Sequence, residues 1–343
     1  MAKTDTRDVK ATVRQIRRLE KVGCQIIRVA VPDEEAAHCL GQIKEQIAIP
    51  LVADIHFDYR LALAAVEAKV DGLRLNPGNI GDKRKIRAVV KAAREAKIPI
   101  RIGVNSGSLE RRYRSGGEGD LPRALVESAG DYINLFEDLG FYDIIVSLKA
   151  SDVLITLESY RLMAERCDYP FHLGITAAGP PFSGAIRSAV GLGILLSEGI
   201  GDTIRVSLTG DPKDEVKAGY EILKSLGLLR GGPTLISCPT CGRCEIDLQK
   251  IVCQVEKSFI TYNSSLITQP LKVAIMGCVV NGPGEAREAD IGVAGGKGFG
   301  VLFRKGKVVK RVPESKLVEA ILKEIERENN PQGFKGSKGR IKD

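Results

Sequence analysis

The chain has 343 residues, of which 43% are apolar and 27% are charged, as is ordinary for a soluble globular protein. No stretch reaches the roughly 18 uninterrupted apolar residues of a membrane span, and residues 1–9 lack the apolar run of a secretion signal. We therefore expect a cytoplasmic protein that does not bind membranes. The net charge is +8, and residues 304–343 alone carry +6 of it, so charge gives little support for nucleic-acid binding.

Strand-like and helix-like segments alternate through the first 229 residues. Segments with apolar residues at helical spacing separate short runs rich in apolar and β-branched residues. The predicted strands are residues 25–31, 51–57, 72–75, 98–104, 143–148, 171–176 and 203–208. This alternation predicts parallel strands joined by crossover helices.

Polar side chains recur at even spacing near the carboxyl ends of five predicted strands. The sets are Asp54 and His56, Arg74 and Asn76, Arg101 and Asn105, Ser147 and Lys149, and Arg205 and Ser207. Even spacing places each set on one face of its strand. These ends meet in a closed barrel but not in an open sheet, so we predict a TIM-type (β/α)8 barrel. Because we find seven strands, we expect the first strand to be missing or truncated, or its place to be taken by another segment.

Three arginines and a lysine at one end of a barrel predict a site for a strongly anionic ligand. The substrate-binding candidates are Arg74, Arg101, Asn105, Lys149, Arg205 and Ser207. Asp54, His56 and Asn76 are candidates for orienting a substrate or transferring protons, although His56 could equally be a structural histidine.

The pattern changes at residues 229–233, where two glycines and a proline indicate a linker. We therefore predict a barrel domain at residues 1–229 and a smaller domain at residues 230–328. Residues 329–343 contain few apolar side chains and are predicted to be a disordered basic tail.

Cysteines gather in the predicted smaller domain. Cys238 and Cys241 have the C-x2-C spacing of a metal-binding turn, and Cys278 is followed by Glu285 after a Gly-Pro-Gly sequence. Thiolates select zinc or iron–sulfur clusters. Three cysteines with Glu285 fit a cluster in which one iron has an exchangeable ligand. Alternatively, the same cysteines with Cys244 could hold a structural zinc or an electron-transfer cluster.

Long motifs in both halves resemble one enzyme family. SCPTCGR at 237–243 and MGCVVNGPGEA at 276–286 resemble the cluster motifs of the 4-hydroxy-3-methylbut-2-enyl diphosphate synthases. VADIHFDYR at 52–60 and IPIRIGVNSGSLE at 98–110 resemble barrel segments of that family. The similarity extends over nearly the whole chain.

The resemblance implies a fold, a reaction and a cofactor. The fold is a TIM-type barrel followed by a small α+β iron–sulfur domain of the sulfite and nitrite reductase type. The reaction is reductive ring opening and dehydroxylation of 2-C-methyl-D-erythritol 2,4-cyclodiphosphate to (E)-4-hydroxy-3-methylbut-2-enyl diphosphate, in the non-mevalonate pathway to isoprenoids. The family's [4Fe–4S] cluster is carried over to Cys238, Cys241, Cys278 and Glu285, and Glu285 is also a catalytic candidate.

The resemblance also implies partners and reveals a departure. Electrons arrive from flavodoxin or ferredoxin, and a homodimer places the cluster domain of one subunit over the barrel of the other. The family commonly has Glu where this chain has Ala177, which cannot transfer a proton. A different class remains as an alternative, a nucleic-acid-binding module with a zinc ribbon.

Overall fold

The computed structural model describes residues 1–76, 80, 82–109, 111–113, 120–229, 232–261 and 270–329. The chain forms two compact units that divide between Leu226 and Gly227. In the described part of the chain, no helix is long and apolar enough to cross a membrane. The predicted disordered tail lies outside the described residues, apart from Asn329 at the end of the last helix.

The first unit is built on parallel strands that run in chain order. The strands are β1 (Ile27–Ala30), β2 (Leu51–Ile55), β3 (Gly72–Leu75), β4 (Ile100–Asn105) and β5 (Ile144–Lys149). β6 (His172–Leu173) pairs with β7 (Thr203–Ile204), and a bridge between Val146 and Phe171 connects β5 to this pair. Each predicted strand segment overlaps one of these strands, and the prediction of a parallel barrel is confirmed.

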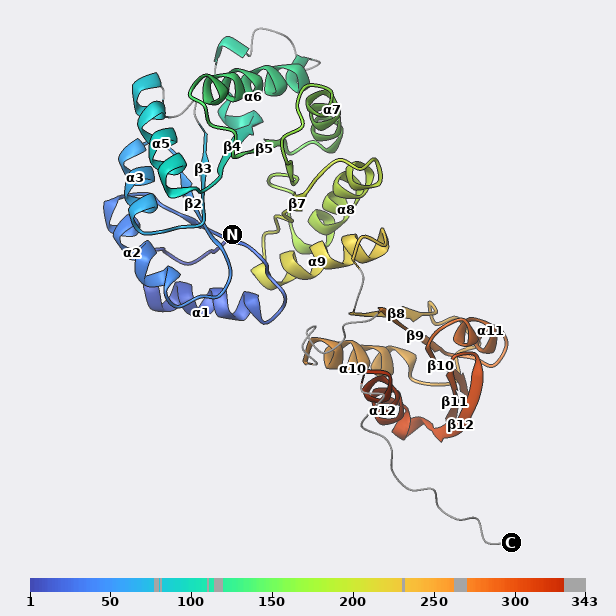
Figure 1. Cartoon of the computed structure of the whole chain (residues 1–343). Coiled ribbons are helices and arrows are strands. Elements are labelled where there is room, and N and C mark those ends of the chain that lie inside the picture. The colour runs from blue at the N-terminus through green and yellow to red at the C-terminus, as the bar shows by residue number, and fades with distance from the viewer. Residues whose placement is uncertain are drawn as a thin grey trace, which may run out of the picture. The chain divides into compact units, whose positions relative to one another are not determined.

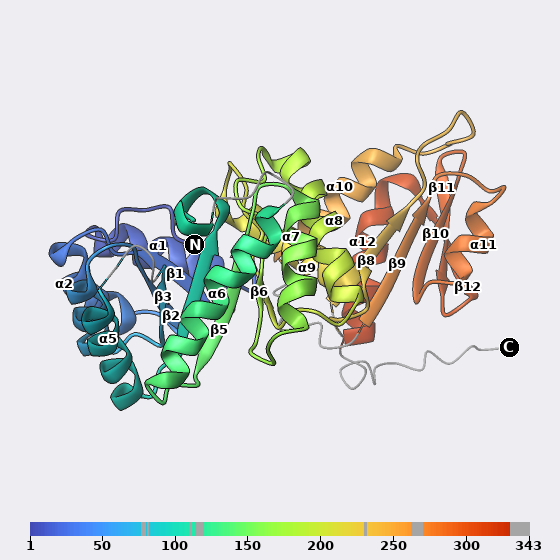
Figure 2. The ribbon, with the colours of Figure 1, turned by 90° about the horizontal axis from the view of Figure 1, so that it is seen from above.

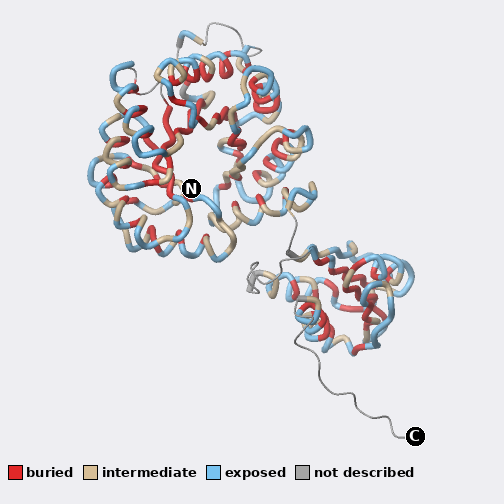
Figure 3. The backbone as a smooth tube through the Cα atoms, viewed as in Figure 1, coloured by how far each residue is buried: buried red, intermediate tan, exposed pale blue. Residues whose placement is uncertain are grey.

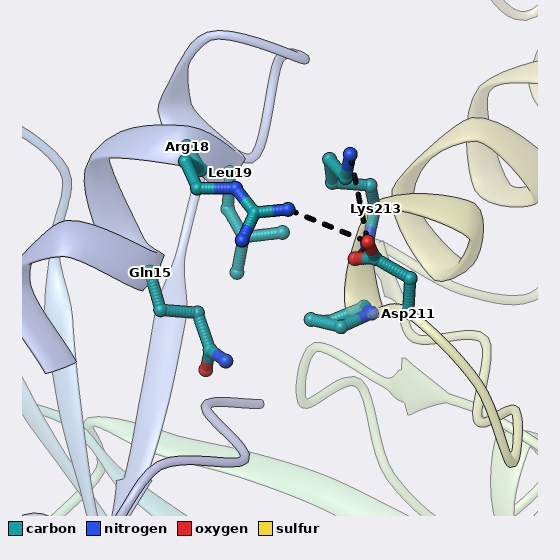
Figure 4. A pocket seen from close by; sticks show the side chains of 6 residues that line it. Gln15, Arg18, Leu19, Asp211 and Lys213 are labelled. Carbon is teal, nitrogen blue, oxygen red and sulfur yellow. Dashed lines mark hydrogen bonds and ion pairs between the residues drawn. The ribbon is translucent and has the colours of Figure 1, made fainter. Parts of the chain in front are cut away.

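Helices surround the strands of this unit (Figure 1). They are α1 (Val9–Glu20), α2 (Glu34–Lys44), α3 (Tyr59–Glu67), α5 (Lys83–Ala96), α6 (Leu121–Asp138), α7 (Val153–Ala164), α8 (Pro181–Ser197) and α9 (Pro212–Ser225). An aspartate caps many of their amino termini by accepting a backbone hydrogen bond from the first turn. These caps are Asp8, Asp33, Asp58, Asp82, Asp152 and Asp211. The core fills the space between strands and helices, where Figure 3 shows buried backbone.

The amino-terminal residues lie between β1 and the segment that follows β7. The Ala2 amide donates a hydrogen bond to the Arg28 carbonyl on β1 at 2.9 Å. Lys3 Nζ donates to the Leu208 carbonyl at 2.9 Å and also to that of Gly210. The described residues before α1 form no strand, so this segment takes the place where the sequence predicted a missing strand.

The second unit is a mixed sheet in the order β12-β11-β10-β9-β8. Its strands are β8 (Gly232–Ser237), β9 (Pro270–Met276), β10 (Ile291–Gly296), β11 (Phe299–Arg304) and β12 (Lys307–Pro313). β8, β9 and β10 are parallel to one another, β11 is antiparallel to β10, and β12 is antiparallel to β11. Lys305 and Gly306 both have positive φ, as a two-residue hairpin turn requires.

Helices cover both faces of this sheet (Figure 2). α10 (Leu248–Thr261) and α12 (Leu317–Asn329) pack on the face that contains Val273 and Ile275. α11 (Gly282–Arg287) packs on the other face, where Ala286 contacts Ala294 and Phe303. The strand alternation of apolar side chains therefore places buried apolar residues on both faces of this sheet.

Candidate active site

Charged side chains form a buried row across adjacent strands of the barrel. Asp54 on β2 is the register partner of Arg74 on β3, and Arg74 is the partner of Arg101 on β4. Their exposed fractions are only 2%, 5% and 6%. Partners in a parallel sheet point to the same side, so these three side chains share the barrel interior. Lys149, at the end of β5, is equally buried and pairs in register with Asn105.

Asp54 is held by cationic and hydrogen-bonding partners. Arg74 Nη1 lies 3.1 Å from Asp54 Oδ1, and Arg28 Nε lies 3.3 Å from Oδ2. His56 Nε2 lies 3.6 Å from Oδ2 and is partly exposed. Burial by itself would raise the pKa of Asp54, but the hydrogen bond from His56 and the charges of Arg28 and Arg74 lower it well below its usual value. Asp54 is therefore ionised at neutral pH.

Arg28, on β1, is a candidate that the sequence analysis missed. It pairs in register with Val52, so its side chain points to the same side as Asp54, two residues further along β2. The next inward position on β1 is Ala30, so β1 shows no second polar residue at even spacing. The available signal is a lone arginine within the apolar run Ile27–Ala30.

The barrel interior contains more positive charge than Asp54 compensates. Within the described residues, Lys149 Nζ, Arg101 Nε and Arg205 Nε are buried without a hydrogen-bond partner. Burial lowers the pKa of Arg28 to about 9 against the opposing charge of Asp54, and burial with the charge of Arg74 lowers that of Arg101 to about 10. Burial and the charge of Arg205 lower the pKa of Lys149 well below its ordinary value. Uncompensated buried charge is unfavourable, so this interior favours an anionic ligand.

Hydrogen bonds from neighbouring elements hold β6 in place at one side of this interior. The Ser147 hydroxyl and the Tyr160 hydroxyl both donate hydrogen bonds to the His172 carbonyl, at 3.0 and 2.7 Å. The His172 imidazole lies 2.8 Å from the Thr203 hydroxyl through Nδ1. Burial and the charge of Lys149 lower the pKa of His172 well below its ordinary value, so this imidazole is neutral. Ser147 is thus engaged in holding β5 to β6.

The remaining candidates from the sequence lie at the same strand ends. Asn76 is buried directly after β3, Asn105 is the half-buried last residue of β4, and Ser207 is half-buried beyond β7. Ala177 follows β6 and is exposed, with a positive φ of 49°. The candidates that were chosen by their even spacing in the sequence therefore lie together at the strand ends of the barrel.

Two of the predicted cluster ligands, Cys238 and Cys278, lie at one end of the second unit's sheet. Cys238 follows β8 directly, and Cys278 follows β9 after Gly277. β8 and β9 are parallel neighbours, and Ser237 pairs with Ile275. The Gly277 amide donates a hydrogen bond to Cys238 Sγ at 3.3 Å, which connects the two turns.

Arg243 adds positive charge near Cys241 and Cys278. A backbone hydrogen bond from Arg243, followed by one from its side chain, lowers the pKa of Cys241. Backbone hydrogen bonds from Asn281 and Val280 lower the pKa of Cys278, with a smaller contribution from the charge of Arg243. A lowered thiol pKa favours the thiolate, which is the form that binds metals.

Cys244 and Glu285 differ in their surroundings. Cys244 Sγ donates to the Ile246 carbonyl at 3.2 Å and lies against Gly277. Glu285 is exposed in the first turn of α11. The described residues contain no group of three or more His, Cys, Asp or Glu placed to bind one metal ion. A [4Fe–4S] cluster makes a different demand, because each ligand binds its own iron, so the ligand set stays a prediction.

Fold and site together define a two-unit α/β protein: a parallel barrel with a cationic interior is followed by a unit whose cysteines gather at one sheet end. Family models match both units: the GcpE TIM-barrel domain covers residues 1–220, and the GcpE protein C-terminal domain covers residues 234–327. The chain therefore belongs to the GcpE family.

Curated relatives are similar over almost their whole lengths. A protein of Caldanaerobacter subterraneus subsp. tengcongensis is 59% identical, covering 95% of this chain and 91% of the relative. One of Geobacter sulfurreducens is 57% identical with the same coverage. Both are named 4-hydroxy-3-methylbut-2-en-1-yl diphosphate synthase (flavodoxin). Among solved structures, dihydropteroate synthase of Yersinia pestis matches at 13% identity over 64% of this chain and 90% of that one. Its TM-score of 0.48 is too low to support an inference.

Proposed function

We propose that this chain reduces 2-C-methyl-D-erythritol 2,4-cyclodiphosphate to (E)-4-hydroxy-3-methylbut-2-enyl diphosphate. The names of its relatives give this product, and the family resemblance of the sequence implies this substrate. The observation that carries the proposal is the excess of buried cations in the barrel interior. A diphosphate brings several negative charges and many acceptor oxygens. It therefore matches an interior in which positive charge exceeds the negative charge of Asp54.

In this proposal the diphosphate is bound by side chains from five strands or strand ends. The binding residues are Arg28, Arg74, Arg101, Asn105, Lys149, Arg205 and Ser207. Guanidinium groups give bidentate hydrogen bonds to phosphate, and the Lys149 ammonium acts as a point charge. Binding stabilises the cations that are uncompensated in its absence, and it holds the carbon skeleton in one orientation for reaction.

Asp54, His56 and Asn76 take different parts. Since its pKa is strongly lowered, Asp54 is an anion at neutral pH and orients Arg28 and Arg74 instead of donating a proton. His56 is partly exposed and lies next to Asp54, which makes it the proton donor in this proposal. Asn76 donates hydrogen bonds that orient the substrate.

The second unit is proposed to hold a [4Fe–4S] cluster through Cys238, Cys241, Cys278 and Glu285, as in iron–sulfur domains of the sulfite and nitrite reductase type. The donor set fits a cluster, because the lowered pKa values of Cys241 and Cys278 favour their thiolate forms and because Glu285 is exposed. When bound, the cluster supplies single electrons and a Lewis-acidic iron for cleavage of a C–O bond. We further propose flavodoxin as the electron donor and a homodimer as the working assembly. Nothing in the described residues or the relatives supports the nucleic-acid-binding alternative.

Cluster content tests the cofactor. Anaerobically purified chain is expected to contain about four irons and four sulfides. Glu285→Gln is expected to change the electron paramagnetic resonance spectrum of the reduced cluster and to reduce turnover. Glu288→Gln serves as the matched control, because Glu288 is exposed directly after α11. A colourless protein with one tightly bound zinc would rule out the proposed cofactor.

Turnover tests the reaction. With reduced flavodoxin under argon, the chain is expected to convert the cyclic diphosphate to the linear one, and Arg101→Met is expected to raise the KM by at least about tenfold. Arg14→Met is the control, since Arg14 lies exposed on α1. Loss of activity to the same degree in both variants would show that the buried cation has no special part.

A further inference from the structure

The inward-facing row of β4 side chains is interrupted by a glycine. Alternate residues of a strand share a face, so Arg101, Gly103 and Asn105 all face the barrel interior. Arg101 pairs in register with Arg74 of β3, and Gly103 pairs with Ser147 of β5. Between the side chains of Arg101 and Asn105, β4 therefore leaves a space open to a neighbouring strand.

The guanidinium of Arg74 fills this space. A Cβ built on Gly103 would overlap Arg74 Nε and would lie 2.8 Å from Nη2 and 3.0 Å from Cζ. These separations are well inside the roughly 3.5–4.0 Å of favourable contact between heavy atoms. The Gly103 carbonyl also accepts a hydrogen bond from Arg74 Nη2 at 3.3 Å. The Arg74 guanidinium thus occupies the space where a side chain at position 103 would lie, and it donates hydrogen bonds to the Gly103 carbonyl and, through Nη1, to Asp54.

The crowding at Gly103 is confined to one flexible side chain. The three nearest atoms to an added Cβ all belong to the Arg74 guanidinium group, and none belongs to the backbone. Gly174 is different, because an added Cβ there would lie 2.7 Å from the Arg205 carbonyl oxygen and 3.1 Å from Lys149 Nζ. Substitution of Gly174 would disturb the backbone, whereas substitution of Gly103 would mainly displace Arg74.

We propose that Gly103 is a positioning residue for diphosphate recognition, which acts by holding the Arg74 guanidinium against β4 next to Arg101. This inference rests on the proposed function of the barrel interior. With any side chain at position 103, Arg74 must swing away from β4, and the two guanidinium groups no longer converge on one ligand. The expected consequence is weaker diphosphate binding, with little change in the reaction of bound substrate.

Gly103→Ala in the cluster-loaded enzyme tests this proposal, with Gly72→Ala as the matched control on β3. A Cβ at Gly72 would lie 3.4 Å or more from its neighbours, which is ordinary contact. By calorimetry, Gly103→Ala is expected to bind inorganic diphosphate at least about tenfold more weakly, and Gly72→Ala within about twofold of the parent. The KM for the cyclic diphosphate should rise by a similar factor, with kcat changed less than about threefold. Unchanged affinity and KM in Gly103→Ala would overturn the proposal.

A double-mutant cycle separates positioning from a general structural effect. In an Arg74→Ala background, Gly103→Ala is expected to cause no further loss of diphosphate affinity beyond about twofold, because the crowded atoms are gone. Should Gly103→Ala alone fold poorly, the double variant is expected to regain the thermal stability of Arg74→Ala. A further tenfold loss in that background, or no recovery of folding, would overturn the inference. Failure of the parent enzyme itself to bind diphosphate would instead contradict the proposed function.

Discussion

Removal of the carboxylate at position 54 is expected to destabilise the barrel strongly. Asp54→Asn keeps the shape of the side chain but leaves Arg28 and Arg74, now at 3.3 and 3.1 Å from the carboxylate, without a counter-charge. Removal of one partner from a buried ion pair costs about 3–5 kcal/mol. For a unit of this length, residues 1–226, each kcal/mol shifts Tm by about 2–4 °C, so we expect a decrease of about 6–20 °C.

Differential scanning calorimetry measures this change, with Asp58→Asn as the control. Asp58 pairs with Arg60 on the surface and caps α3, and asparagine caps a helix equally well. The control is therefore expected to shift the free energy of unfolding by less than about 1 kcal/mol. If Asp54→Asn shifted Tm no more than Asp58→Asn, the interpretation of Asp54 as the counter-charge of the interior would be refuted.

The same pair predicts the direction of a pH effect. The pKa of Asp54 is lowered in the folded state, so its contribution is complete above the unfolded-state value of about 3.9 and is lost as the pH falls below it. The difference in Tm between the parent and Asp54→Asn should therefore be constant above about pH 5 and shrink on further acidification. A difference that grew toward acid pH would contradict this sign.

Three further substitutions test individual features. Lys149→Met removes a buried amino group without a hydrogen-bond partner, so calorimetric Tm should rise while the affinity for inorganic diphosphate falls at least about tenfold. Tyr160→Phe removes a buried hydroxyl that donates to His172 and accepts from Leu148, which should lower the free energy of unfolding in urea by about 1–3 kcal/mol. Ala177→Gly relieves a left-handed backbone and should raise that free energy by up to about 1 kcal/mol, whereas a decrease would argue against strain there.

The polar site residues on the strands were predictable because a polar residue within an apolar strand is a strong signal of a functional position. Asp54, Arg74 and Arg101 each interrupt a buried run, and even spacing fixes the side to which they point. In the parallel sheet, Asp54 pairs in register with Arg74 and Arg74 pairs with Arg101, so the three side chains form one row. Arg28 was missed because β1 has a single inward-facing polar residue and therefore shows no even spacing of polar residues.

Other features depend on tertiary contacts that leave no local pattern. Ala2 and Lys3 lie between β1 and the segment that follows β7, where the Ala2 amide and Lys3 Nζ donate hydrogen bonds to backbone carbonyls. Carbonyl acceptors are present at every residue, so they leave no pattern in the sequence. The guanidinium position at Gly103 likewise depends on a side chain from the neighbouring strand. Ligation by Glu285 could be named from a family resemblance, but its exposed place on α11 by itself does not identify a ligand.

A crystal structure of the anaerobic complex with the cyclic diphosphate would test the central claim most directly. The account predicts diphosphate oxygens within about 2.7–3.2 Å of nitrogens of Arg28, Arg101 and Lys149 in the barrel interior. Diphosphate bound elsewhere, with Arg101 Nε and Lys149 Nζ still lacking a partner, would contradict it.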